Sequence, residues 1–134
     1  MIEISSDKDK LDIEVIHSFL SNSYWGKGRT KEEVKVTIEN SLNFGVYLHG
    51  QQIGYARITT DYVVFAYLMD VFILPKYRRK GYSKKLLKTI VDFPELSNVK
   101  TWLLMTKDAH GLYTQFGFAE LKHPEKVLER IIER

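Results

Sequence analysis

The sequence contains no cysteine among its 134 residues. A chain without thiols has no disulfide framework, no thiolate metal site and no cysteine nucleophile. It also lacks any run of about 18 apolar residues, so we expect no membrane-spanning helix and no membrane partner. The opening residues, Met1 to Ser5, lack the basic and apolar parts of a signal peptide. We therefore expect a cytoplasmic protein.

What is present is the composition of a globular protein, with 44% hydrophobic and 28% charged residues. This length suffices for one core, so we expect a single domain over residues 1–134. The net charge is only +3, but one short stretch without acidic residues holds Lys76, Arg78, Arg79, Lys80, Lys84, Lys85 and Lys88. The positive electrostatic potential of this cluster attracts an anion. The stretch has no helix-turn-helix, zinc-finger or RNP signature, so we expect no nucleic-acid partner.

The hydrophobic pattern predicts alternating helices and strands. Strands are expected over 2–5, 44–48, 53–60, 63–73, 99–105 and 118–121, and helices over 11–20, 30–42, 80–93, 108–116 and 124–133. Thr30 and Glu33 form a capping box at one helix start. The longest apolar run, 63–73, is expected to be a central strand buried on both faces. The strand–helix–strand crossover that follows favours parallel pairing with 99–105. The fold class is therefore mixed α/β.

A basic turn joins the 63–73 strand to the next helix. Backbone N–H groups at a helix start lack partners within the helix, and the helix dipole is positive there. Such a turn can hold a phosphate or pyrophosphate group. Gly81 allows close approach of the backbone, and Ser83 is small. The turn thus predicts a ligand that carries a phosphate or pyrophosphate group.

Two motifs carry a resemblance to a known family. The spacing Arg78-x-x-Gly81-x-Ser83 resembles the acyl-coenzyme-A loop of the GNAT superfamily of N-acetyltransferases, with Ser83 in place of the usual Gly or Ala. Residues 109–118, Ala-x-x-Leu-Tyr-x-x-x-Gly-Phe, resemble the second family signature. Thr106 departs from the family, which often has asparagine there. The resemblance implies a twisted mixed central sheet with helices on both faces, two of whose strands splay to admit the pantetheine arm.

The resemblance also implies an activity. This is transfer of an acetyl group from acetyl-coenzyme A (acetyl-CoA) to a primary amine, by direct attack in a ternary complex and without a metal. We expect the amine to belong to a small molecule; a homodimer is compatible with this interpretation. The expected cofactor contacts are Val71, Phe72, Ile73, Arg78, Arg79, Lys80, Gly81, Tyr82, Ser83 and Lys84. The alternative is a non-catalytic acyl-CoA sensor or interaction module with the same fold.

The resemblance places Tyr113 as general acid toward the leaving thiolate; the alternative is a packed aromatic residue. Asp70 stands in an apolar run, where it is either the base, directly or through a water, or a structural carboxylate held by neighbouring donors. Asp108 is expected to be the N-cap of the helix that carries Tyr113. The acceptor pocket is expected to include Trp25 and Arg29, with Tyr24 and Phe44 as further candidates. Arg29 suits a carboxylate on the acceptor, although a loop merely anchored by Trp25 is also consistent.

Overall fold

The computed structural model describes residues 1–133, which form one central sheet flanked by helices. The strands are β1 (Ile2–Ser5), β2 (Leu42–Leu48), β3 (Gln51–Thr60), β4 (Phe65–Ile73) and β5 (Thr101–Leu104). The helices are α1 (Ile13–Ser21), α2 (Lys31–Glu39), α3 (Tyr82–Val91) and α4 (His110–Thr114). Short 3₁₀ turns lie at Lys8–Lys10, Pro75–Tyr77, Pro94–Leu96 and Pro124–Lys126.

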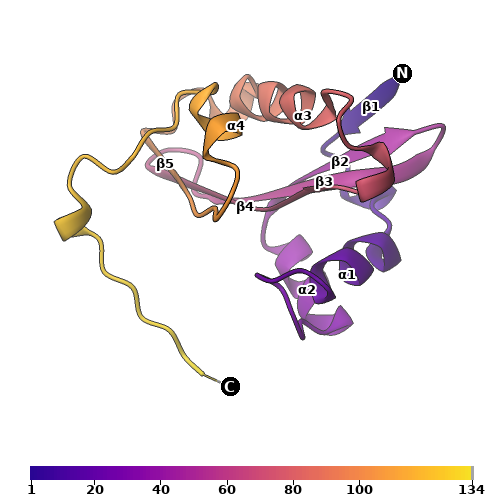
Figure 1. The fold of residues 1–134 in the computed structure, drawn as a ribbon, viewed down its shortest axis with the longest axis horizontal. Helices are drawn as coiled ribbons and strands as arrows, with labels where there is room; N and C mark the ends of the chain where they lie inside the picture. Colours follow the sequence, from indigo (N-terminus) through magenta and orange to yellow (C-terminus); the bar gives the residue numbers. More distant parts are fainter. Residues whose placement is uncertain (134) are drawn as a thin grey trace.

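The sheet follows the order β1-β2-β3-β4-β5. The first four strands pair antiparallel, whereas β4 and β5 pair in parallel across the α3 crossover, as predicted. Helices α1 and α2 cover one face of the sheet, and α3 and α4 cover the other (Figure 1). The predicted mixed α/β fold with helices on both faces is confirmed.

Each face of the sheet has its own core. On the α3 side, Leu86 and Ile90 belong to a cluster with strand residues such as Ile58. On the α1 side, Ile16 and Val34 pack with buried aromatic side chains of the sheet, Tyr55 and Phe72. The buried faces of these helices follow the expected apolar spacing.

The two helices on the α1 side have side-chain caps. The Thr30 capping box at α2 is present as predicted. At α1, Asp12 is the N-cap, and its carboxylate accepts hydrogen bonds from the N–H groups of Glu14 and Val15. The helix therefore begins at Ile13, two residues later than expected, because this carboxylate satisfies its first donors.

The strands buried on both faces are β2 and β3. All residues from Asn43 to Tyr47 of β2 and from Gln52 to Ile58 of β3 are buried, whereas side chains of β4 alternate between buried and partly exposed. The prediction that 63–73 is buried on both faces was therefore wrong. One face of β4 borders an open space that the sequence does not reveal.

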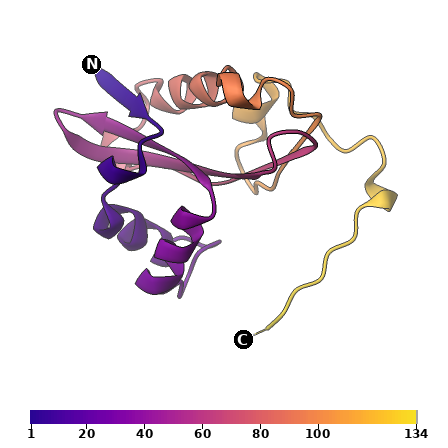
Figure 2. The same cartoon turned by 180° about the vertical axis from the view of Figure 1, so that it is seen from behind.

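The C-terminal prediction also failed. Residues 118–121 form no strand, and only the Pro124–Lys126 turn stands where we expected a helix over 124–133. After α4 the chain leaves the body and runs outward in an arc (Figures 1 and 2). A short amphipathic segment becomes helical mainly by packing its apolar face, and here Leu128 and Ile131 have no core to pack against.

Among the helices of residues 1–133, none has the length and apolar character needed to cross a bilayer.

Candidate functional site

The site lies where β4 and β5 part. Their ladder runs from Phe65 opposite Thr101 to Leu68 opposite Leu104 and then stops. β4 continues to Ile73, and within residues 1–133 no strand pairs with that edge of β4 beyond Leu68. A cavity of about 910 Å³ occupies this divergence. Its lining includes Phe19, Tyr24, Trp25, Arg29, Tyr67, Met69, Asp70, Val71, Phe72, Ile73, Arg78, Ser83, Met105, Lys107, Leu112 and Tyr113.

A β-bulge shapes the floor of this cavity. Tyr55 pairs with Phe72, but Arg57 pairs with Met69, so Asp70 and Val71 together lie opposite the single residue between them on β3. Asp70 has φ 55°, in the left-handed region that Asp tolerates better than most residues. A bulge re-aims the side chain it contains.

The Asp70 carboxylate receives three donors and is only 1% exposed. Arg57 Nε on β3 lies 2.9 Å from Oδ2, and Arg29 Nη1 lies 2.7 Å from the same oxygen. Trp25 Nε1 donates to Oδ1 at 3.0 Å. These three hydrogen bonds are what we expect if Asp70 is a structural carboxylate held by neighbouring donors, because a buried carboxylate needs such partners. A role as base stays a prediction.

Trp25 and Arg29 both line the cavity, at the loop between α1 and α2. The Arg29 N–H donates to the Gly26 carbonyl at 3.0 Å, and the Arg29 carbonyl lies 3.0 Å from His17 Nε2. The Arg29 side chain remains 21% exposed. Within the described chain its guanidinium hydrogen-bonds only to Asp70, so further N–H groups are available to a ligand.

Aromatic rings form the rest of this wall. Trp25 lies 5.1 Å from the Tyr24 ring and 6.0 Å from the Phe19 ring, measured between centroids. Phe19 stacks on Phe72 of β4 at 4.1 Å. The wall is therefore anchored to the strand that carries Asp70. Tyr24 lies here as expected, but Phe44 was wrongly placed: it is buried in the core and packs against Phe93.

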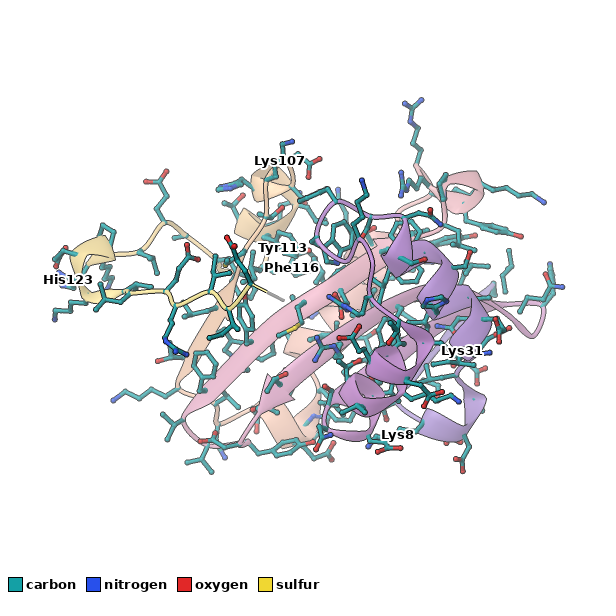
Figure 3. The ribbon with its side chains drawn as sticks, turned by 90° about the horizontal axis from the view of Figure 1, so that it is seen from below. Lys8, Lys31, Lys107, Tyr113, Phe116 and His123 are labelled. Atoms are coloured by element: carbon teal, nitrogen blue, oxygen red, sulfur yellow. The ribbon has the colours of Figure 1, made fainter. Side chains whose placement is uncertain are left out.

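Tyr113 faces the cavity from α4 and is almost completely buried. Burial, helped by Tyr24 and Asp108, raises the pKa of Tyr113 to about 12. The hydroxyl therefore keeps its proton at neutral pH. In Figure 3 Tyr113 lies next to Phe116, which follows α4 in the chain.

The start of α4 differs from the prediction. Ala109, not Asp108, occupies the N-cap position, and the Ala109 N–H donates to Thr106 Oγ1 at 3.1 Å. Within residues 1–133 no side chain caps α4, and the Thr106 hydroxyl holds only the N–H of the N-cap residue itself. This hydrogen bond also gives Thr106 a structural purpose at the rim of the cavity.

The basic loop forms a second hollow of about 280 Å³. Its lining residues are Ile73, Tyr77, Arg78, Arg79, Gly81, Tyr82, Ser83, Lys84 and Leu112. Ile73, Arg78 and Ser83 also line the larger cavity, so the two hollows are adjacent. The structure thus brings together the expected cofactor contacts, with Lys80 in the same loop but outside both linings.

The loop presents unpaired backbone donors. Across residues 1–133, no hydrogen bond satisfies the N–H groups of residues 79–84. Gly81 has φ 79°, and a Cβ added there would meet no atom within 4 Å. Arg78 Nε donates to the Ile73 carbonyl at 2.9 Å and ties the loop to the end of β4. These features suit a phosphate-bearing ligand.

Some residues in and behind the cavity were not predicted. Arg57 lies behind Asp70 and outside the cavity lining; it stands in a mostly buried strand, where a lone arginine signals a buried carboxylate partner. Lys107 lies with its Nζ 5.5 Å from the Tyr24 ring centroid. Tyr67 and Met69 line the cavity only because of the bulge and the divergence of β5. No local pattern marks those two features.

The comparisons with known proteins agree with this geometry. Residues 15–118 match the model of the acetyltransferase (GNAT) family. A crystal structure of a GNAT-family acetyltransferase from Xanthomonas campestris pv. campestris is 40% identical, has a TM-score of 0.96, and covers 98% of this chain and 94% of its own. An acetyltransferase-like protein of Gibberella zeae is 26% identical over 82% of this chain and 74% of its own length.

A more distant structure shares the fold. It is an acetyltransferase from Clostridium acetobutylicum determined with acetyl-CoA, with 17% identity, a TM-score of 0.70, and coverage of 98% of this chain and 96% of its own. With the family matched over most of the chain and the parted strands and basic loop in place, this protein belongs to the acetyltransferase (GNAT) family.

Proposed function

We propose that this protein transfers an acetyl group from acetyl-CoA to the primary amine of a small molecule, by direct attack in a ternary complex. One observation carries the proposal: the gap between β4 and β5 adjoins the unpaired N–H groups of the basic loop and holds a protonated tyrosine. An anion site, an apolar channel and a proton donor are thus contiguous. Such positioning is what acyl transfer requires.

The donor would be held by two sets of groups. The N–H groups at the start of α3, with the nearby cations Arg79, Lys80 and Lys84, suit the pyrophosphate. The free edge of β4 from Val71 to Ile73 offers backbone groups to the extended amide arm, in the manner of an added strand. When bound, acetyl-CoA supplies the activated acetyl thioester.

Tyr113 would donate the proton that the departing thiolate takes up. Its raised pKa keeps the hydroxyl protonated throughout the neutral range, and the residue belongs to the lining of the cavity. A buried phenol also lets the transfer occur away from bulk water.

Asp70 would position the acceptor wall and would not remove the proton of the amine directly. Both of its oxygens are engaged, one by the two arginines and the other by Trp25. Solvent in the open cavity would then take the proton. Arg29 is fixed by Asp70 yet still exposes N–H groups, which suits an acceptor that carries a carboxylate or another acidic group.

The rival is a protein that binds acyl-CoA without transferring the acyl group. The full engagement of Asp70 favours this rival to some degree, because it leaves no free carboxylate at the bulge. A sensor would bind acetyl-CoA tightly and release no thiol with any amine.

The test is a screen of amines against acetyl-CoA with a thiol-release readout and mass spectrometry of the products. The panel contains amino acids, polyamines, aminoglycosides and lysine peptides. We expect release with small amines that carry an acidic group. Acetyl-CoA binding without turnover on any amine would support the sensor, and turnover on lysine peptides alone would overturn the acceptor class.

A further inference from the structure

The cavity contains a carboxylate that the fold does not use. Within residues 1–133, the acidic side chains in its lining are Asp70 and Asp108. Asp70 is closed to a ligand, because both of its oxygens accept hydrogen bonds from neighbouring side chains. Asp108 is exposed and does not cap α4, and its carboxylate forms no hydrogen bond or ion pair within the described chain. Asp108 is therefore the acidic group that a ligand in the cavity can meet.

Asp108 lies near the group that we propose as proton donor. It stands two residues before α4, whose Tyr113 borders the same cavity. Burial is the main cause of the raised pKa of Tyr113, and Tyr24 and Asp108 raise that pKa further. The influence of one charge on another falls with distance, so Asp108 and Tyr113 are close. An ammonium group bound at Asp108 would lie in the part of the cavity where Tyr113 acts.

Another wall of the cavity carries positive charge that is not balanced. Asp70 is shared by Arg29 and Arg57, and the other recorded partners of Arg57, Ser41 and Met69, are neutral. Two guanidinium groups thus share one carboxylate, which leaves this cluster positive. Arg29 presents that charge to the cavity, with N–H groups still free. An anionic group on a ligand would neutralise it.

The two charged groups belong to different loops that border one cavity. Arg29 lies in the loop between α1 and α2, and Asp108 lies in the loop between β5 and α4. These loops meet where Lys107 Nζ lies 5.5 Å from the ring centroid of Tyr24. Lys107 is thus turned toward the other loop. Arg29 and Asp108 therefore offer opposite charges to the two ends of one ligand.

The cavity beside these charges is lined by apolar side chains. Tyr67 and Met69 of β4 and Met105 after β5 belong to the lining. The Tyr67 ring stacks with Phe65, with centroids 6.4 Å apart, and is thereby held in place. Met105 is 71% exposed, so in the described chain it is open to a ligand. Aromatic and thioether surfaces suit a ligand with an apolar body.

We propose that the acceptor is an amino acid with a large apolar group, and that Asp108 binds its ammonium group. The assignment rests on the proposed function and specifies its acceptor. The carboxylate of the amino acid binds Arg29, and its apolar group packs on Tyr67 and Met105. Polyamines and aminoglycosides are rejected, because they bring no negative charge to Arg29.

Asp108 also takes part in the movement of protons. An ammonium group that becomes an amide loses two protons. The first passes to a water held by Asp108 and on to solvent, which frees the nitrogen lone pair to attack the thioester carbonyl. Attack forms the C–N bond, and collapse of the tetrahedral intermediate breaks the C–S bond. The nitrogen then releases its second proton, which replaces the one that Tyr113 gives to the thiolate.

The first test measures binding without the acetyl donor. The probes are two amino acids, L-phenylalanine, whose charges are adjacent, and 6-aminohexanoate, whose charges are far apart. Each is compared with its analogue without the ammonium group (3-phenylpropanoate, hexanoate) and without the carboxylate (phenethylamine, hexylamine). We expect at least one amino acid to bind about tenfold or more tightly than both of its analogues by calorimetry. If neither does, the proposal is overturned.

The second test removes the charge of Asp108. Asp108→Asn alters an exposed position, so the melting temperature should not change. The affinity for the amino acid should fall about tenfold, to that of the analogue without the ammonium group, whose own affinity should not fall. Asp9→Asn is the matched control, because Asp9 is exposed and outside both hollows. Unchanged amino-acid binding by Asp108→Asn, or an equal loss for both probes, would overturn the proposal.

Thiol release from acetyl-CoA separates this assignment from the proposed function. If other small acidic amines are acetylated while the two amino acids bind no better than their analogues, the function stands and the assignment fails. If an amino acid binds as expected and no thiol is released, the binding role of Asp108 stands and the transfer reaction fails. With both intact, Asp108→Asn should raise the KM of the amino acid and spare that of acetyl-CoA.

Discussion

Arg57 on β3 and Asp70 on β4 meet across the bulge, with Nε 2.9 Å from Oδ2 and both side chains almost fully buried. The bulge turns Asp70 toward Arg57 and Arg29, and the left-handed φ of Asp70 keeps it there. One carboxylate thereby joins the sheet to the loop that forms the acceptor wall. The stability of this contact and the shape of the cavity depend on the same residue.

Replacing Asp70 by Asn should destabilise the fold while keeping its backbone. Asn also tolerates the left-handed conformation and has nearly the same shape. It lacks the charge that compensates Arg57 and Arg29, so we expect the free energy of unfolding to fall by about 3 kcal/mol. Urea denaturation measures this. Asp92→Asn, at an exposed ion pair with Lys88, should cost well under 1 kcal/mol. Equal effects would contradict the structural role of Asp70.

The same variant separates positioning from proton transfer. If Asp70 only positions the wall, the pH–rate profile of Asp70→Asn should keep its shape while the rate falls. Loss of the acidic limb of the profile would instead assign Asp70 as base or water relay. The profile is measured only under conditions in which the Asp70→Asn variant stays folded.

A bulky side chain at Ser83 should block the anion site. Ser83 lines both hollows and is partly buried, so Ser83→Trp would fill the space beside the unpaired N–H groups. We expect the affinity for coenzyme A to fall about tenfold or more by calorimetry. Lys85→Trp, at an exposed position on α3, is the control and should bind normally. Undiminished binding by Ser83→Trp would place the cofactor elsewhere.

Removing the Tyr113 hydroxyl should slow the chemistry and spare binding. Tyr113→Phe should lower turnover about 10²-fold with little change in acetyl-CoA affinity. Because the pKa of Tyr113 is about 12, the pH–rate profile below pH 10 should keep its shape. Tyr67→Phe, another tyrosine of the cavity, is the matched control. Wild-type turnover in Tyr113→Phe would leave Tyr113 as a packing residue.

Arg29 is expected to act on the acceptor. Arg29→Ala leaves Asp70 with Arg57 and Trp25, so the fold should survive. The acceptor KM should rise far more than that of acetyl-CoA, because binding common to ground and transition states is lost. Lys27→Ala in the same loop should change neither value much. Equal changes for both substrates would assign Arg29 to the cofactor side or to folding.

Tyr47 offers a test of stability. Its hydroxyl is buried and, among the buried side-chain atoms of the described chain, is the one without a hydrogen-bond partner. Tyr47→Phe removes that group, so we expect the free energy of unfolding to rise by about 1 kcal/mol at pH 7. Denaturant titrations of the two proteins measure the difference. A destabilised variant would mean that the hydroxyl has a partner in solution.

Stability should fall in alkali. Burial raises the pKa of Tyr47 and of Tyr113 from 10.0 to about 12. Between pH 10 and 12 the unfolded chain therefore loses protons that the folded chain keeps, which favours unfolding. The free energy of unfolding should decline across this window and be flat just below it, with a shallower decline in Tyr47→Phe. Constant stability up to pH 12 would contradict these shifts.

Local chemistry explains what was predictable. Capping by Thr30, the apolar faces of the helices and the spacing of Arg78 and Gly81 are readable because each depends on residues a few positions apart. The parallel pairing of β4 with β5 followed from the crossover between them. These features were enough for the fold class and for the place of the basic loop between β4 and α3. The roles of that loop and of Tyr113 came from the family resemblance and stay predictions.

Long-range geometry explains what was missed. The bulge arises from the mismatch of β3 and β4, and the triple contact of Asp70 joins residues 25, 29, 57 and 70. The C-terminal segment has helical spacing of Leu128 and Ile131, but helicity at that length depends on tertiary packing that the described chain does not supply. Phe44 was misplaced because a sequence does not show which face of a strand borders the cavity.

Because the ladder between β4 and β5 is short, the strands of this sheet are not held together equally strongly against a mechanical force. Four residue pairs join β5 to β4 and four join β1 to β2, against seven between β2 and β3. A force that pulls the two ends of the sheet apart sideways should therefore separate one of these two outer ladders before the central ones. A ligand bound in the gap between β4 and β5 would contact both sides of it and resist their separation. The rupture force measured on single molecules should therefore increase when the site is filled.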